Sequence, residues 1–269
     1  MAGNGDFAAK YGPWAFVAGA SEGMGEAYAR EAASRGLHVV LAARREERLD
    51  RVARAIRSDF GVETRPLVLD LAAEDLLEQV RGATQDLEMG LLVYNAASVS
   101  VGRFLDRELA DHIRSIDVNC RGPVVLSHHF GGLMAKRGRG GIVVMTSGAA
   151  FSGCGFLASY SASKAFDLNL GESLWAELKP RGVDVLALIG GATNTPHTLS
   201  TGIDFAALGA PVMEAEDVVR EAFDQLGEEP NWIPGEHNRQ SMGQLQAAPR
   251  RLVIEGMTGT NQKLYAFED

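Results

Sequence analysis

Two side chains that can exchange a proton stand four residues apart in the segment SYSASKAFDLNLGESLWAELKPRG. Tyr160 and Lys164 are separated by about one helical turn, so both side chains project from the same face of a predicted helix. A free phenol has a pKa of about 10, and a neighbouring ammonium lowers that value because it stabilises the phenolate. A lowering of about 3 pH units corresponds to about 4 kcal/mol. The spacing therefore predicts that Tyr160 is a general acid or base, tuned by Lys164.

A hydroxyl that suits such chemistry precedes this pair in the chain. Ser147 ends the apolar run GIVVMTS, which is typical of a buried strand. At the carboxyl edge of a sheet its hydroxyl can hydrogen-bond a substrate carbonyl. A strand-end hydroxyl that caps its own turn is the plainer alternative.

A glycine-rich turn follows the first apolar run, in the segment AGASEGMGEAYARE. Glycines let the backbone approach a ligand closely, and the N-terminus of the following helix attracts phosphate groups. The spacing is G-x-x-x-G-x-G and not the G-x-G-x-x-G of the common dinucleotide fingerprint, so a turn that only packs stays an alternative. The residues assigned to the cofactor phosphates here are Gly19, Ser21, Gly23, Met24 and Gly25.

Arginines stand at the end of the second predicted strand, where an NAD site carries an acid that binds the ribose hydroxyls. Arg44 and Arg45 of the segment AARREERLD occupy this place. A guanidinium suits a 2′-phosphate that a carboxylate would repel, so NADP(H) is favoured over NAD(H). Glu22 in the glycine turn opposes this preference, and a solvated helix start is the alternative reading of the charged run.

A fold must hold these residues in place, and the sequence indicates which fold, because apolar runs alternate with segments of helical period. The pattern predicts one α/β domain over residues 1–269, a doubly wound, Rossmann-type parallel sheet with helices on both faces. Ligands of such sheets bind at the carboxyl ends of the strands. Strands are predicted at 14–18, 37–42, 64–69, 91–94, 142–146, 183–189 and 231–234. Helices are predicted to begin near Met24, Glu46, Ala73, Arg107, Ala158 and Glu216.

Two segments have no clear period. Residues 193–213 are predicted to form a loop on the substrate side, because a loop of this length in a compact domain is usually functional. Its apolar residues suit a lid over an apolar substrate, with packing against the domain as the alternative. They are Leu199, Ile203, Phe205, Leu208, Val212 and Met213. Residues 235–269 are predicted to be an irregular C-terminal extension, in which Pro249 breaks any helix.

Composition excludes several classes of function. The formal net charge of -9 argues against binding to nucleic acid. Cys120 and Cys154 are too few for a disulfide framework. The sequence shows neither a signal peptide nor a run of about 20 apolar residues that could span a membrane. We therefore expect a cytoplasmic protein without membrane contact. His128, His129 and His197 have no partners at metal-binding spacing, so no metal is predicted.

The motifs together resemble the short-chain dehydrogenase/reductase family over roughly residues 14–195. The resemblance rests on AGASEGMG, Asp70 after the third strand, YNAA, DVN, TS and YSASK. It implies that Tyr160 is the acid or base, that Lys164 tunes it and holds the ribose, that Ser147 polarises the carbonyl, and that Asn119 supports a water chain to the lysine. It further implies cofactor contacts by Tyr160, Lys164, Asp70, Leu71, Asn95, Ala96, Ala97, Gly191, Thr193 and Thr195.

Some positions depart from the family pattern. Ala97 replaces the glycine of the NAG motif, Gly190 and Gly191 replace the PG pair after the sixth strand, and Ala18 replaces the usual threonine. The implied reaction is hydride transfer between a nicotinamide and an apolar ketone or alcohol of small to medium size. The alternative is a non-catalytic nucleotide-binding protein of the same fold. The resemblance also implies a homodimer or homotetramer.

Overall fold

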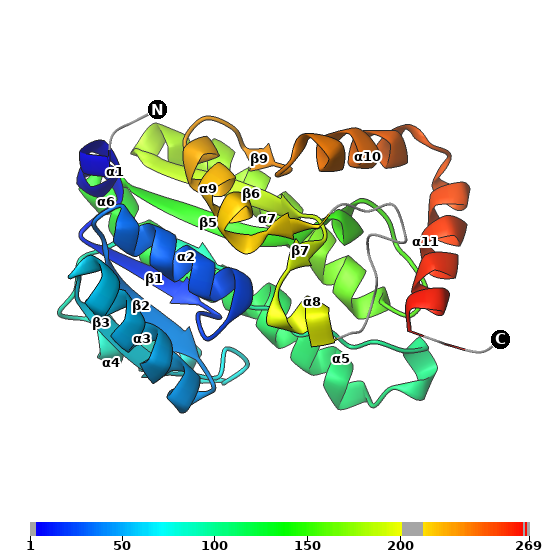
Figure 1. The fold of residues 1–269 in the computed structure, drawn as a ribbon, viewed down its shortest axis with the longest axis horizontal. Helices are drawn as coiled ribbons and strands as arrows, with labels where there is room; N and C mark the ends of the chain where they lie inside the picture. The colour runs from blue at the N-terminus through cyan, green and yellow to red at the C-terminus, as the bar shows by residue number, and fades with distance from the viewer. Residues whose placement is uncertain (1–3, 201–211, 266, 268–269) are drawn as a thin grey trace.

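A seven-stranded parallel sheet forms the centre of the computed structural model, which describes residues 4–200, 212–265 and 267 (Figure 1). The strand order is β3-β2-β1-β4-β5-β6-β9. From β1 to β3 each new strand is added on one side of the sheet, and from β4 onward on the other side, so the topological switch point lies between β1 and β4. All six neighbouring pairs are parallel. The strands are β1 (Trp14–Ala18), β2 (His38–Ala43), β3 (Thr64–Val68), β4 (Met89–Tyr94), β5 (Gly140–Ser147), β6 (Val183–Gly190) and β9 (Asn231–Trp232). The predicted doubly wound α/β fold is confirmed, and each predicted strand is present with small shifts at its ends.

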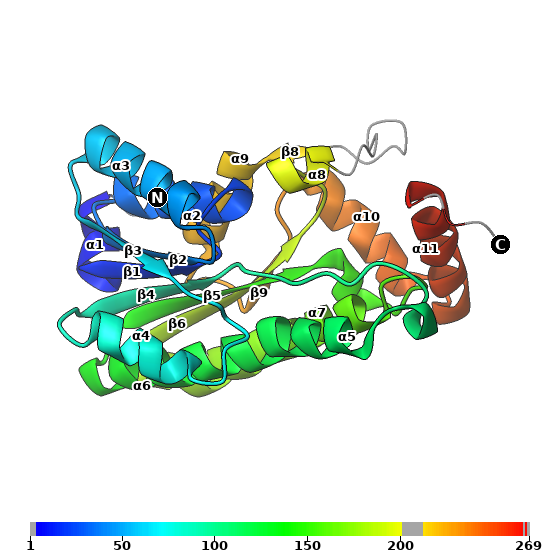
Figure 2. The same ribbon diagram turned by 90° about the horizontal axis from the view of Figure 1, so that it is seen from below.

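Helices cover both faces of this sheet, as Figure 2 shows. One layer packs against the sheet through a core that includes residues of α1 (Asn4–Tyr11), α2 (Gly23–Ser34), α3 (Glu46–Phe60) and α9 (Ala215–Gln225). The opposite core includes residues of α4 (Leu76–Thr84), α6 (Gly122–Arg137) and α7 (Ala158–Leu178). The helix α5 (Leu109–Ile116) continues the second layer toward the C-terminal end of the sheet.

Strand β1 shows why the strands of this sheet are apolar along their whole length. Ala15 and Val17 belong to one core, whereas Trp14, Phe16 and Ala18 belong to the other. Side chains of a strand alternate between its two faces, so a strand that is covered on both sides must be apolar throughout.

The helix expected to begin near Arg107 is present, but a π-helical turn divides it into two α-helical parts. It begins at Leu109, passes through a π-helical turn at Asp117–Arg121 (η2) and continues as α6. A π-turn inserts one extra residue per turn, and such turns frequently occur at functional sites. Two 3₁₀ turns, at Phe104–Asp106 (η1) and Gly148–Phe151 (η3), flank the helical layer, and a third at Lys179–Arg181 (η4) ends α7.

The prediction of an irregular C-terminal extension at 235–269 is wrong. Helices α10 (Glu236–Ala247) and α11 (Arg250–Leu264) occupy most of it and pass along the end of the sheet (Figure 1). Pro249 stands at the N-cap of α11, where a missing N–H breaks no helical hydrogen bond. The sequence concealed these helices because they bury few residues, chiefly Met242, Val253 and Asn261.

The described ends of the segment 193–213, predicted to be a loop, contain regular structure. It contains β7 (Thr193–Asn194) and α8 (Pro196–Ser200), and β7 pairs in parallel with β8 (Met213–Glu214). Leu199 and Val212 are exposed, whereas Met213 packs against the core. The predicted lid residues Ile203, Phe205 and Leu208 lie outside the described residues.

Candidate active site

Helix α7 holds Tyr160 and Lys164 against the carboxyl end of β5. The Lys164 ammonium lies 5.9 Å from the centre of the Tyr160 ring. It is 3% exposed, and it donates hydrogen bonds to the Met145 carbonyl (2.8 Å) and to Oδ2 of Asp167 (2.9 Å). Burial opposes the charge, but the pKa of Lys164 is nevertheless raised because Asp167 and Tyr160 stabilise the ammonium. Lys164 is therefore a buried, charged group beside the phenol.

The end of β5 fixes the backbone beside this pair. The Thr146 hydroxyl donates to the Lys164 carbonyl at 2.7 Å, which ties the strand to α7. The Ser147 hydroxyl accepts a hydrogen bond from the Ala149 amide at 3.3 Å, so it does cap the turn that follows the strand. Its own proton can still be donated to a carbonyl oxygen, because a hydroxyl donates and accepts at once. The capping role and the predicted catalytic role of Ser147 are thus compatible.

Asn119 lies at the middle of the π-helical turn and is fully buried. Its Oδ1 accepts from the Ser98 amide at 2.7 Å, and its Nδ2 donates to the Ser98 carbonyl at 2.8 Å and to the Ser163 hydroxyl at 2.9 Å. The side chain therefore joins the loop after β4 to α7. The sequence resemblance placed Asn119 near Lys164. Its hydrogen-bond partners Ser98 and Ser163 could not be identified from the spacing of residues in the sequence.

The glycine turn between β1 and α2 is as tight as the phosphate hypothesis requires. A Cβ atom on Gly25 would lie 1.9 Å from the Gly19 carbonyl oxygen, and one on Gly19, at φ 87°, would lie 2.9 Å from Ala96 Cα. A Cβ on Gly23 would lie 3.2 Å from Thr195 Cβ. Ala96, Thr195 and the N-terminus of α2 therefore converge on one turn, and the N-terminus of a helix is a place where backbone N–H groups can bind an anion.

Two arginines at the start of α3 pair with the Glu22 carboxylate of the glycine turn, and Arg44 precedes them at the end of β2. Arg45 donates to Oε1 of Glu22 at 2.6 Å and to the Ser21 hydroxyl at 3.1 Å, and Arg48 also contacts Glu22. Arg48 was not anticipated, although its place one turn beyond Arg44 is visible in the sequence. Arg44 is exposed and forms no ion pair with the described residues. Glu22 is thus paired, and Arg44 can bind a phosphate.

Asp70, which follows β3, has a partner that the sequence did not reveal. Arg114 of α5 donates to both carboxylate oxygens at 3.0 to 3.2 Å, and the Ala72 amide donates to Oδ1 at 3.0 Å. Partial burial disfavours the charge, but these donors hold the pKa of Asp70 below its ordinary value. Leu71 is buried in the core beside it.

The other predicted cofactor residues follow β4 and β6. Asn95 donates to the Gly19 carbonyl at 3.4 Å, and Thr193 donates to the Gly191 carbonyl at 3.2 Å. Ala97 is exposed next to them. Every residue assigned to the cofactor from sequence, apart from Tyr160 and Lys164 on α7, therefore follows the carboxyl end of a strand in the same sheet. The roles themselves stay predictions.

The C-terminal helix α11 adds residues that sequence reasoning missed. Asn261 donates to the Gly155 carbonyl at 3.0 Å, and the Gly155 amide donates to the Thr258 hydroxyl at 2.8 Å. Burial, followed by the nearby Tyr160, raises the pKa of Tyr265. Helix α11 is therefore attached to the loop that precedes the catalytic pair, and Tyr265 at its C-terminal end is near enough to Tyr160 for an electrostatic interaction.

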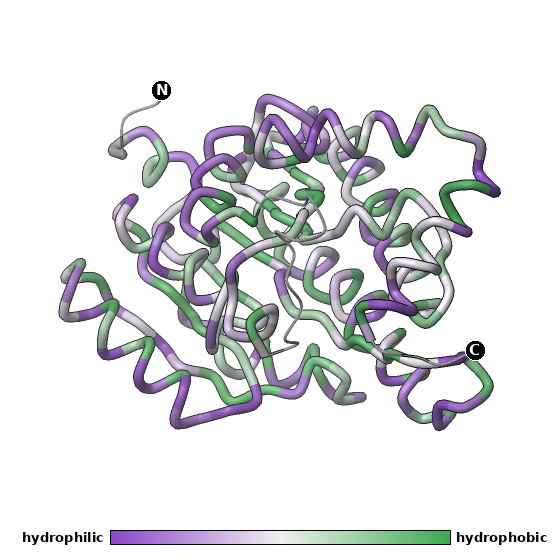
Figure 3. The backbone as a smooth tube through the Cα atoms, turned by 45° about the vertical axis from the view of Figure 1, so that its right-hand side comes forward, coloured by the Kyte–Doolittle hydropathy of each residue, from purple (hydrophilic) through white to green (hydrophobic). Residues whose placement is uncertain are grey.

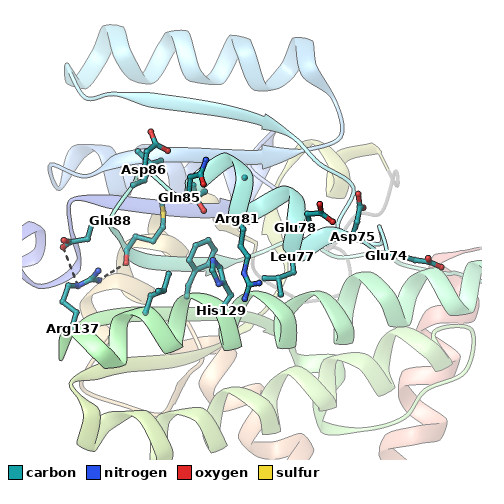
Figure 4. Close-up of a pocket in the computed structure, with 16 residues that line it drawn as sticks. Glu74, Asp75, Leu77, Glu78, Arg81, Gln85, Asp86, Glu88, His129 and Arg137 are labelled. Atoms are coloured by element: carbon teal, nitrogen blue, oxygen red, sulfur yellow. Dashed lines mark hydrogen bonds and ion pairs between the residues drawn. The ribbon is translucent and has the colours of Figure 1, made fainter.

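A cavity of about 1190 Å³ lies between α4 and α6 (Figure 4). Arg81, His129 and Arg137 line it together with several acidic residues, and none of the predicted catalytic residues does so. Burial lowers the pKa of His129, with Arg81 adding to the effect.

In the described ranges no three His, Cys, Asp or Glu side chains gather in a way that could hold a metal ion. None of the helices described there is long and apolar enough to cross a membrane.

Comparison with known proteins identifies this arrangement. A family model described as short chain dehydrogenase matches residues 13–204. A 7β-hydroxysteroid dehydrogenase of Clostridium sardiniense is 36% identical over 249 residues, which are 93% of this chain and 95% of the relative.

Solved structures agree. One from a study of 7β-hydroxysteroid dehydrogenase stereoselectivity has a TM-score of 0.89 and 33% identity, and the match covers 93% of this chain and 98% of the other. A short-chain dehydrogenase from Sphingobium yanoikuyae in complex with NADPH has a TM-score of 0.76 and 28% identity, with 96% of each chain covered. The chain belongs to the short-chain dehydrogenase/reductase family and is an oxidoreductase that acts on CH–OH and C=O groups with NAD(P).

Proposed function

We propose that this protein is an NADP(H)-dependent hydroxysteroid dehydrogenase that interconverts a ketone and a secondary alcohol on an apolar, fused-ring substrate. The buried Lys164 ammonium beside the Tyr160 ring carries the catalytic part of this proposal, because a module that only binds nucleotide needs no phenol paired with an ammonium. The substrate class is supported by the similarity to a 7β-hydroxysteroid dehydrogenase over nearly the whole of both chains.

Each side chain of the site has a role that its surroundings allow. Tyr160 passes a proton to the substrate oxygen in reduction and takes it back in oxidation. Lys164 stabilises the phenolate, and Ser147 donates a hydrogen bond to the substrate oxygen. Asn119 keeps α7 in register with the loop after β4. A bound nicotinamide nucleotide supplies or accepts the hydride.

The glycine turn fits the pyrophosphate of such a nucleotide, since side chains larger than hydrogen at Gly19 and Gly25 would collide with the backbone. NADP(H) is favoured because Glu22 is paired with Arg45 and Arg48, which leaves the exposed Arg44 for a 2′-phosphate. The NADPH complex of a structural neighbour supports the same choice.

The substrate side includes α11 and the described parts of the segment 193–213, which are residues 193–200 and 212–213. Leu199, which is 71% exposed, and Val212 offer apolar surface on the described parts of that segment. Tyr265 at the C-terminal end of α11, and Phe267 stacked on Phe156 with ring centres 4.5 Å apart, supply aromatic surface near the C-terminal end of the chain. Such walls suit a rigid apolar substrate.

We also propose a homodimer or homotetramer in the cytoplasm. Helices α5, α6 and α7 expose large apolar side chains, which is the usual mark of an interaction surface. They are Ile113, Ile116, Val124, Leu133 and Phe166. Both cysteines are free thiols, as expected in a reducing compartment.

A kinetic assay tests the function. Purified protein is incubated with NADPH or NADH and with ketosteroids that carry the carbonyl at different ring positions, and with aryl and aliphatic ketones. We expect NADPH oxidation with at least one ketosteroid at a kcat/KM at least about tenfold above that with the simple ketones. The absence of turnover with every ketone, while the nucleotide still binds, would establish the non-catalytic alternative.

A further inference from the structure

The active-site lysine has a buried acidic neighbour whose presence the proposed mechanism does not explain. Asp167 lies one helical turn after Lys164 on α7 and is 1% exposed. Its Oδ2 accepts the hydrogen bond from the Lys164 ammonium at 2.9 Å. Its Oδ1 is also buried and has no hydrogen-bond partner among the described residues. Removing a carboxylate from water is costly, and one hydrogen bond compensates it only in part.

The position of this carboxylate determines how Lys164 uses its three N–H donors. One donor goes to the Met145 carbonyl and a second to Asp167, so two of the three point toward β5 and the body of α7. The remaining donor is left for the phenol and for the ligand. The negative charge of Asp167 also acts on Tyr160 in opposition to the positive charge of Lys164.

We propose that Asp167 is a positioning residue for Lys164, which holds the ammonium on the Met145 side and offsets part of the charge that stabilises the Tyr160 phenolate. This inference rests on the proposed catalytic roles of Tyr160 and Lys164. Its consequence is kinetic. The negative charge of Asp167 opposes formation of the phenolate that takes the proton in alcohol oxidation, so this charge should affect the pH dependence of oxidation.

The groups that face Asp167 come from three elements. Lys164 lies on α7 itself, Cys120 lies on the π-helical turn, and Tyr94 lies on β4. Burial, opposed by Lys164, raises the pKa of Asp167 to about 6, so the carboxylate is ionised at neutral pH. Burial and then the Asp167 charge raise the pKa of Cys120 to about 11, which makes this thiol an independent reporter of that charge.

The principal test is the pH dependence of kcat/KM for alcohol oxidation in wild type and Asp167→Asn. An amide oxygen keeps the hydrogen bond to Lys164 and removes the charge. We expect the acidic limb of the profile to move down by about one pH unit, so that oxidation at pH 6.5 rises severalfold. A limb that moves by less than about 0.3 unit, or moves upward, overturns the proposal. A purely structural Asp167 would lower the melting temperature without this shift.

Matched variants separate a local charge effect from a general one. Glu177→Gln removes the same charge from an exposed site on the same helix and should leave the profile in place. If Asp167→Asn does not fold, Asp167→Thr and Asp167→Glu are measured in its place. The proposal requires the limb to shift in the Thr variant and to stay in the Glu variant, and the reverse order overturns it.

A second measurement needs no turnover, so it distinguishes failure of this inference from failure of the proposed function. Alkylation of Cys120 by iodoacetamide at pH 8.5 is followed by peptide mass spectrometry. Asp167→Asn should accelerate it by about 3- to 10-fold, because loss of the nearby charge increases the thiolate fraction. An unchanged rate would show that the charge is not placed as inferred, whatever substrate the enzyme uses.

Discussion

The proposed preference for NADP(H) rests on one exposed arginine, Arg44, and replacing it by an acid tests the assignment. Near the end of β2, Glu22 contributes one negative charge, its partners Arg45 and Arg48 contribute two positive charges, and the exposed Arg44 contributes a third. The sum over these four groups is therefore +2. Arg44→Asp lowers this sum to 0 and places a carboxylate where the 2′-phosphate is expected.

The magnitude follows from the interaction that is lost. A charge-assisted hydrogen bond to a phosphate contributes about 1.5 to 3 kcal/mol, which corresponds to a factor of about 10 to 150 in binding. Solvent screens an exposed group, so the lower half of this range is expected at physiological salt, and a larger effect is expected at low ionic strength.

The assay compares kcat/KM for NADPH and NADH in wild type and Arg44→Asp. We expect the NADPH value to fall by at least about tenfold and the NADH value to change by less than about threefold. Arg51→Asp is the matched control, because it makes the same change of charge further along α3, where Arg51 pairs with Glu26 at 3.4 Å. A wild-type enzyme that prefers NADH, or a ratio of the two values that Arg44→Asp leaves unaltered, would refute the role assigned to Arg44.

Four further outcomes are expected. Tyr160→Phe should lower kcat by more than about tenfold, a loss above ~1.4 kcal/mol, while NADPH titration still shows binding; retention of a higher rate would remove Tyr160 from proton transfer. Lys164→Ala should weaken NADPH binding and move the pH profile of oxidation to higher pH, and an unmoved profile in an active variant would contradict its role. Gly25→Ala should lower the melting temperature and abolish nucleotide binding, because its Cβ would lie 1.9 Å from the Gly19 carbonyl oxygen. If calorimetry gives the variant the melting temperature and the nucleotide affinity of the wild type, the turn is not as tight as described. Burial raises the pKa of Cys120 to about 11, so its alkylation should be slow at pH 8 and should rise about tenfold per pH unit up to that value, whereas a plateau below pH 9 would contradict the burial.

The C-terminal region and the charged end of β2 show where reasoning from sequence stops. Helices α10 and α11 were not predicted, because their few buried positions leave only a weak apolar period. Glu22 was expected to oppose NADP(H), but the fold brings Arg48 as well as Arg45 against it. Asp70 and Arg114 pair across a separation of 44 residues, which no local pattern encodes.

The sequence by itself determined the seven strands of the sheet and most of the helices between them, the glycine turn and the one-turn spacing of Tyr160 and Lys164, because these depend on periodicity and on local backbone geometry. The tertiary structure decided what surrounds them. Asp167 is three residues from Lys164 in the chain, and such a pair on a helix is usually solvated. Only the packing of α7 against β5 removes both groups from water, and in that low-dielectric setting a single carboxylate can alter the chemistry of the site.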